Sequence, residues 1–484
     1  MPLTYDWEWE SFERLLNNNS FNIVDSGPLR APIRRFSISR DEKLKLIMET
    51  RAEQTATSIA DDYPLGTVRV NTDAVTLSDG RGIEVVAAGV QSRGWKSSFF
   101  GDPAQSELRE ECSIHSLRGT IAPSLEPKHV IDWLANVDDS FLWPDTCDDE
   151  TEITKTRTLC GGNSGPVLKA GRRNTASSRN CAKISVDGRE LYLCAATPAA
   201  AKTVSKPGFI LYMGAPTEEF RNKVRRCLSF SLGTYFVYLG CSTFSEDWAL
   251  ASFEAISAYS LGRKAFELPP LPPSPLGKNY EGELDRDVLS RMVNSIYSNY
   301  DALDFGHLSW AYWHAVCATP HIAAVHFGAV VEALQRSYLK ANRNALKTKL
   351  FEREEWKRIK ASAESAISVL AVDEKVKGIM KNKLDGLNAR PQSLVTENLM
   401  ALLQLDLGER EKRAWSRRNA AAHGGTSETE EIVDLIRARI YLTRPSAKRM
   451  MVVRAGVRDD LRNSAHCSSR QERTEGYGCP HVQV

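Results

Sequence analysis

The sequence predicts an α+β protein of several domains, in which a β-rich, sandwich-like N-terminal half precedes an all-helical C-terminal half. From about residue 20 to 260, short runs alternate apolar and polar side chains or are rich in β-branched and aromatic residues. Beyond a proline-rich segment, apolar residues recur at intervals of three and four, as in amphipathic helices. The length of 484 residues also exceeds what one hydrophobic core normally serves.

In the N-terminal half, residues 1–265, the pattern predicts strands separated by short turns. Asp79-Gly80 and Asp187-Gly188 indicate hairpins, because an Asp-Gly pair tolerates the positive φ angles of a tight turn. Two helices are expected among the strands, at Pro127–Leu134 and Glu218–Leu228. The clearest strand candidates are Phe36–Ser39, Lys43–Met48, Val68–Val70, Ile83–Val86, Leu191–Cys194 and Tyr235–Leu239.

Five prolines between Glu267 and Gly277 disfavour helix and favour an extended spacer, so residues 266–278 are expected to be a linker. A proline-rich ligand for an SH3-like partner is the less favoured alternative. Residues 279–443 are expected to form a helical bundle, and the basic segment 444–484, which loses this periodicity, to be disordered. The expected helices are Leu284–Tyr300, Leu308–Ala318, His321–Ala341, Glu354–Ala371, Glu374–Leu387, Leu394–Leu405 and Glu430–Leu442.

Composition limits the kinds of partner. A net charge of +2 excludes a polycation built to coat nucleic acid, so any RNA contact must be a local patch. The sequence holds no apolar run long enough for a membrane span, and its acidic, aromatic start is unlike a signal peptide. The ten scattered cysteines fit reduced thiols in the cytoplasm, and neither a metal nor a cofactor is expected.

The segment Arg418-Asn419-Ala420-Ala421-Ala422-His423-Gly424 combines the groups that a metal-free ribonuclease needs. An imidazole can take the proton from a ribose 2′-OH and return one to the leaving 5′-oxygen, while an arginine stabilises the developing phosphate charge. Three alanines favour helix, which places Asn419 and His423 on one face. The sequence therefore proposes Arg418, Asn419 and His423 as catalytic residues. The alternative is a solvated helix end.

Neighbouring residues extend this candidate site. Arg413 and Trp415 could contact single-stranded RNA through a phosphate and a stacked base, and Arg417 could support catalysis. Equally, they could form a basic solvated face. Glu332 could orient Arg418 or His423 across the helices, or it could pair with Arg336 one turn later on the same helix.

The run Arg418-Asn419-x-x-x-His423-Gly424, at the end of a helical region, resembles the HEPN family, whose ribonuclease members carry Arg-x4–6-His. His326–Gln335 resembles the first core helix of that family, which often carries a Glu before Ala-Leu, here Glu332. The HEPN-like part covers about residues 280–443. A β-rich half before it is similar in layout to anti-phage proteins of the ApeA type.

This resemblance implies an all-α HEPN bundle that cleaves RNA, with tRNA one candidate substrate, without a metal ion. It implies a homodimer or higher oligomer that shares its active sites, and a β-rich half that senses or regulates. It further implies a role in anti-phage defence by abortive infection, with a phage-derived activator and no membrane partner. The alternative is a non-catalytic HEPN-like module that binds nucleotides or dimerises, beside a β-rich recognition domain.

Other candidate sites are weaker. Gly161–Pro166 resembles the nucleophile segment of trypsin-like proteases, but it lacks one glycine, so a turn explains Ser164 better. His307, His314, His321 and His326 lack the spacing of a helical zinc pair and are expected in a half-buried core or interface. The pairs His466-Cys467 and Cys479-x-His481 match no zinc module.

Overall fold

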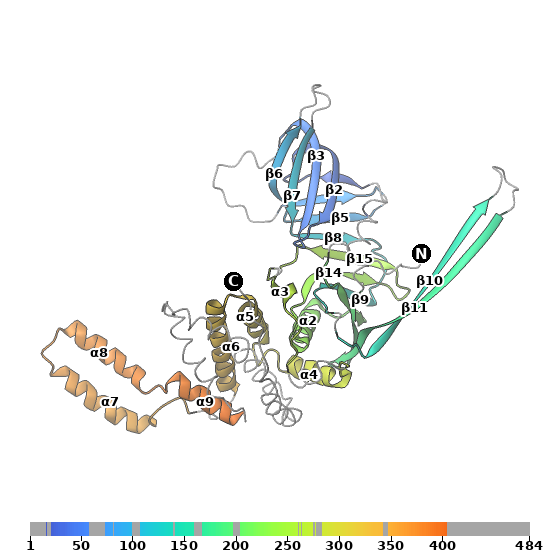
Figure 1. The fold of residues 1–484 in the computed structure, drawn as a ribbon. Coiled ribbons are helices and arrows are strands. Elements are labelled where there is room, and N and C mark those ends of the chain that lie inside the picture. The colour runs from blue at the N-terminus through green and yellow to red at the C-terminus, as the bar shows by residue number, and fades with distance from the viewer. Residues whose placement is uncertain are drawn as a thin grey trace, which may run out of the picture. The chain divides into compact units, whose positions relative to one another are not determined.

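The computed structural model divides the chain into two compact units, Met1–Tyr297 and Ser298–Val484, each described here by itself. Figure 1 shows the elements in order along the chain. The structure describes residues 16, 21–57, 73–98, 107–138, 141–158, 167–196, 204–273, 276, 283–341 and 347–403, apart from single gaps at 81, 260 and 263.

The first unit consists mainly of antiparallel strands. The larger sheet has eleven strands in the order β1-β4-β5-β8-β15-β14-β9-β13-β12-β11-β10, and the smaller has four in the order β2-β3-β7-β6. The strands are β1 (Asn22–Asp25), β2 (Ala31–Arg40), β3 (Leu46–Thr57), β4 (Ala74–Ser78), β5 (Glu84–Ala88), β6 (Gln91–Ser98), β7 (Glu107–Ile114), β8 (Ser116–Thr120), β9 (His129–Ala135), β10 (Asp145–Thr158), β11 (Val167–Val186), β12 (Arg189–Ala195), β13 (Gly208–Met213), β14 (Val237–Phe244) and β15 (Leu250–Ile256).

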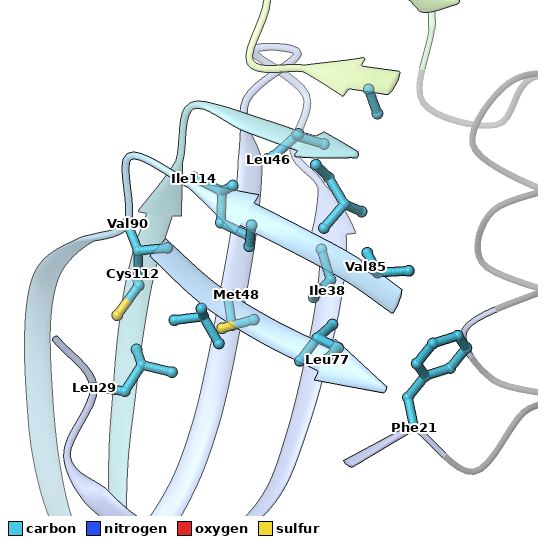
Figure 2. Close-up of a cluster of buried hydrophobic side chains, with 14 of the residues drawn as sticks. Phe21, Leu29, Ile38, Leu46, Met48, Leu77, Val85, Val90, Cys112 and Ile114 are labelled. Atoms are coloured by element: carbon cyan, nitrogen blue, oxygen red, sulfur yellow. The ribbon is translucent and has the colours of Figure 1, made fainter. Parts of the chain in front are cut away.

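The smaller sheet packs against one end of the larger one. Figure 2 shows their shared core, in which Ile38, Met48 and Ile114 of the small sheet meet Leu77 and Val85 of the large sheet. The expected sandwich-like N-terminal domain is wrong, because a single eleven-stranded sheet runs through this unit and this core covers only one end of it. Alternation identifies strands, but it does not say which strands become neighbours.

The middle of the large sheet is covered by α2 (Glu218–Leu232), which confirms the helix expected at Glu218–Leu228. Thr217 accepts a hydrogen bond from the Phe220 amide at the start of α2, and Gly233 ends it in the left-handed conformation. The helix expected at Pro127–Leu134 is wrong, because these residues lie largely in strand β9.

Strands β10 and β11 form a long hairpin that extends beyond the rest of the sheet (Figure 1), and β10 is the edge strand. Val186 and Arg189 pair across the two-residue turn that joins β11 to β12. Asp187 and Gly188 both have positive φ in this turn, which confirms the hairpin expected there.

The proline-rich segment packs onto the first unit. Pro270, Pro272 and Pro273 are buried, and the amide of Leu271 donates to the Gly233 carbonyl at 3.1 Å. After it, α4 (Arg286–Ser298) also lies with this unit, since Asn294 accepts from the amide of Asp187. The two compact units divide between Tyr297 and Ser298, at the end of α4. A short helix, α3 (Lys264–Glu267), precedes the prolines.

In the second unit the described elements are helical. The helix expected at Glu430–Leu442 lies outside the described residues, and the other helices expected in this unit are present with small shifts at their ends. They are α5 (Phe305–Cys317), α6 (Pro320–Ala341), α7 (Arg353–Ser368), α8 (Glu374–Leu387) and α9 (Gln392–Leu402). Among the described helices, none combines the length and apolar character needed to cross a bilayer.

The expected all-α bundle is wrong. Helices α5 and α6 pack together, but α7 and α8 form a separate hairpin in which most side chains are exposed. Within α7 only Ile367 is buried, while Ile359, Val376 and Ile379 of this hairpin are exposed. Amphipathic spacing predicted the helices correctly, but these apolar faces do not meet in one core.

Candidate functional site

The predicted catalytic residues Arg418, Asn419 and His423 lie outside the residues that the structure describes, as do Arg413, Trp415 and Arg417. The same holds for Ser164 and for the two His/Cys pairs near the end of the sequence. Among the predicted site residues, the structure describes Glu332.

Glu332 lies half-buried on α6, one turn before a buried polar cluster that joins α6 to α9. The Gln335 amide donates to the Thr396 hydroxyl at 2.5 Å, and Gln392 donates to the Gln335 carbonyl oxygen. Thr396 in turn donates to the Gln392 backbone carbonyl at 2.9 Å. These bonds fix the helix that carries Glu332 against the last described helix before the Arg418 segment.

The aromatic and histidine residues of α5 form a row on that helix. The ring centroids of Trp310 and His314 are 4.0 Å apart, and the rings of His307 and Trp310 are stacked with centroids 6.1 Å apart. His314 and His326 are half-buried, as expected, but His307 and Trp310 are exposed. These rings offer a stacking surface, and the sequence analysis did not assign them that role.

The best-defined charged cluster of the first unit is buried. Arg221 and Arg225, one turn apart on α2, donate to the two carboxylate oxygens of Asp132 in the middle of β9. The three side chains are 9%, 8% and 0% exposed, respectively. Burial by itself lowers the pKa of the Arg221 guanidinium, but Asp132 and nearby groups more than offset this, so the pKa is raised. A cluster buried in this way is better suited to a structural role than to contact with a substrate.

A second cluster consists of thiols. Cys147 of β10, Cys181 of β11 and Cys194 of β12 place their sulfur atoms within 4.8 Å of one another. The sulfurs of Cys181 and Cys194, which pair directly across the two strands, are 3.4 Å apart. Cys181 and Cys194 are buried and Cys147 is half-buried. Among the described residues, this is the group of His, Cys, Asp and Glu side chains that could hold a metal ion.

The pKa values of the three thiols are shifted in different directions. Hydrogen bonds with Cys181 and Cys194 lower the pKa of Cys147, because they favour its thiolate against the opposing effect of burial. The same bonds to Cys147 raise the pKa of Cys181 and of Cys194, and burial adds to the rise. The titration therefore belongs to the group of three thiols as a whole.

Neither the Asp132 cluster nor the thiol cluster was predicted from the sequence. Cys181 and Cys194 lie 13 residues apart and Cys147 lies on a third strand, so no short motif reveals them. The Asp187-Gly188 turn could have revealed two of the three cysteines. A two-residue turn pairs Val186 with Arg189, and this register brings Cys181 opposite Cys194.

Comparisons of this chain with protein-family models, with curated proteins and with solved structures find no match. The resemblance to the HEPN family therefore rests on the residues that carry it in this sequence.

Proposed function

We propose that this protein is an endoribonuclease that cuts RNA through the ribose 2′-OH without a catalytic metal ion. The observation that carries the proposal is the segment Arg418-Asn419-Ala420-Ala421-Ala422-His423. It supplies one group that moves protons near neutral pH and one cation that stays charged at all pH values of interest.

The reaction is a phosphoryl transfer within one nucleotide. The neutral imidazole of His423 takes the 2′-OH proton, and the 2′-oxygen attacks the adjacent phosphorus. The bond from phosphorus to the 5′-oxygen breaks, and the imidazolium returns its proton to that oxygen. The products are a 2′,3′-cyclic phosphate, which water can open to a 3′-phosphate, and a 5′-hydroxyl. Arg418 stabilises the charge that builds on the non-bridging oxygens, and Asn419 orients the phosphate or His423.

Residues around Arg418 and His423 would support catalysis and RNA binding. Glu332 would orient Arg418 or His423, and its helix α6 is fixed to α9 by the Gln335 and Thr396 side chains, which supports a positioning role. Arg417 would add positive charge, while Arg413 and Trp415 would hold a phosphate and stack on a base. Two copies of the chain would share their sites in a homodimer.

We place this activity in the cytoplasm, in defence against phage, where RNA cleavage would arrest an infected cell. The β-rich first unit would sense a phage component and restrain the nuclease until it binds. This division of roles follows from the resemblance in layout, and it is separate from the chemistry at His423.

The test uses untagged, purified full-length protein and total RNA in the presence of EDTA. We expect cleavage, with 2′,3′-cyclic phosphate or 3′-phosphate ends and 5′-hydroxyl ends. His423→Ala should lower the rate at least about 100-fold, the size of a general acid–base contribution. Arg418→Ala should lower it by a similar factor, because it removes a charge that stabilises the transition state.

Matched controls come from the same part of the sequence. His466→Ala and Arg437→Ala remove the same side-chain types outside the proposed site and should leave the rate unchanged. Full activity of His423→Ala would overturn the proposal. An RNA-inert protein whose melting temperature rises with nucleotide, and loses that rise in Arg418→Ala, would favour the alternative of a non-catalytic nucleotide-binding module.

A further inference from the structure

The neighbouring strands β10, β11 and β12 bring their cysteines together on one face of the large sheet. Figure 1 shows the long β10–β11 hairpin that extends from this part of the sheet. Asp145 pairs with Cys181, and Cys181 pairs with Cys194, so these three residues lie in line across β10, β11 and β12. Cys147 follows two residues after Asp145 on β10 and therefore shares its face. Half-exposure of Cys147 leaves a path from solvent to the cluster.

We propose that Cys147, Cys181 and Cys194 together bind one Zn²⁺ ion, with a water molecule in the fourth position. A Zn–S bond of about 2.3 Å in a tetrahedral site separates the sulfurs by about 3.8 Å. The separation of 3.4 Å between Cys181 and Cys194, and the limit of 4.8 Å for the whole group, lie on either side of that value. Small side-chain rotations are enough to admit the ion.

A fixed carboxylate next to the three cysteines would support zinc binding. The Asp145 carboxylate accepts from the Lys183 amide at 2.7 Å and from Arg286 at 3.2 Å, so its position beside the cluster is fixed. A carboxylate held in this way can orient a zinc-bound water, as outer groups do in other zinc sites.

A disulfide between Cys181 and Cys194 is the competing use of these thiols. Their sulfurs would have to approach from 3.4 Å to about 2.05 Å, and the bond would leave Cys147 without a role. Zinc uses all three thiols at their observed spacing. It would also link the edge strand β10 to β12, two strands away, and so stabilise the base of the β10–β11 hairpin.

The experiment measures metal in untagged, full-length protein purified under reducing conditions without chelator. We expect about one zinc per chain by elemental analysis. Cobalt added to the metal-free, reduced protein should give intense sulfur-to-cobalt charge-transfer absorption. Cys147→Ser should lose most of the zinc and the cobalt signal. Cys317→Ser is the matched control, because Cys317 is also half-buried but lies on α5, and it should keep both.

Folding is checked separately, by circular dichroism and by hydrogen exchange of β10. Cys147→His, which keeps a metal ligand at this position, should restore most of the zinc even if Cys147→Ser melts at a lower temperature. The proposal fails if neither zinc nor cobalt binds the reduced protein, or if Cys147→Ser retains a full complement of metal. It also fails if the freshly purified protein holds a Cys181–Cys194 disulfide and no metal. None of these readouts depends on RNA cleavage.

Discussion

Replacing Asp132 with asparagine tests whether the first unit depends on a carboxylate that compensates the charges of Arg221 and Arg225. In Asp132→Asn the side chain keeps its shape but loses its charge. Its carbonyl oxygen can still accept from one arginine, whereas its NH₂ group faces the second guanidinium, donor against donor. Arg221 and Arg225 would then be two cations, less than a tenth exposed, without the carboxylate that both of them contact.

We expect a large decrease in the free energy of unfolding. Breaking a buried ion pair by removing one partner costs about 3–5 kcal/mol, because the remaining charge is desolvated and uncompensated. At about 1.4 kcal/mol per factor of ten, this lowers the folding equilibrium constant by roughly two to three and a half orders of magnitude. For a unit of this size the melting temperature should fall by about 2 °C per kcal/mol, or roughly 6–10 °C in total.

The assay is unfolding by urea and by heat, with hydrogen exchange of α2 and β9 to assign the loss to this unit. Glu254→Gln is the matched control, since it makes the same chemical change in a pair with Arg118, 69% exposed, at 2.6 Å. That pair should contribute about 0.2–1 kcal/mol. A loss in Asp132→Asn no larger than that in Glu254→Gln would refute the reasoning.

A triple variant separates the cost of an unpaired charge from the cost of altered shape. Asp132→Leu combined with Arg221→Met and Arg225→Met removes the whole cluster and leaves apolar side chains of similar size. Because complete replacement of buried ion networks is often neutral, most of the lost stability should return. If the triple variant is as unstable as Asp132→Asn, packing rather than charge explains the effect.

Three further predictions concern stability. Burial raises the pKa of the Tyr212 and Tyr238 phenols, so the folded chain keeps protons that the unfolded chain releases near pH 10. The unfolding free energy should therefore fall above pH 10 by about 1.4 kcal/mol per pH unit for each phenol, and Tyr238→Phe should make the fall less steep in alkaline urea titrations. Gly233→Ala should cost more, by thermal melting, than Gly188→Ala. Both glycines have positive φ, but a Cβ at Gly233 would lie 2.1 Å from the Leu271 backbone, whereas Gly188 has open space. Met48→Ala should cost about 2–5 kcal/mol in urea unfolding and Met213→Ala much less, because Met48 is fully buried and Met213 is exposed.

Strand β9 shows where prediction from sequence reached its limit. Residues Val130–Ala135 are buried on both faces of the sheet, so they lack the alternation that marked other strands. Only the fold explains a charged Asp132 in the middle of this buried strand, because its partners Arg221 and Arg225 lie on helix α2, about 90 residues further along the chain. By contrast, α2 was predicted correctly because Thr217 and Glu218–Leu228 show a helix start and helical spacing locally.

The two candidate sites differ in the same respect, because one is formed by residues close in sequence and the other by residues on separate strands. The proposed Arg418 and His423 pair is local in sequence, so a motif is enough to suggest it. The thiol cluster is assembled by strand pairing, and three cysteines on separate strands carry no spacing signature. The division of strands between two sheets is likewise a property of long-range pairing.

The two proposals meet in one experiment, because EDTA can remove zinc from a thiolate site as well as any metal ion at an active site. Cys147→Ser removes the zinc ligand without altering Arg418 or His423. We expect both wild type in EDTA and Cys147→Ser without EDTA to cleave RNA, since the chemistry at His423 uses no metal ion. If EDTA and Cys147→Ser both lower the rate, with matching losses of β10 protection, the zinc site supports the fold that the nuclease needs. If EDTA abolishes cleavage and Cys147→Ser does not, the reaction itself requires a metal ion, and the mechanism proposed for His423 is wrong.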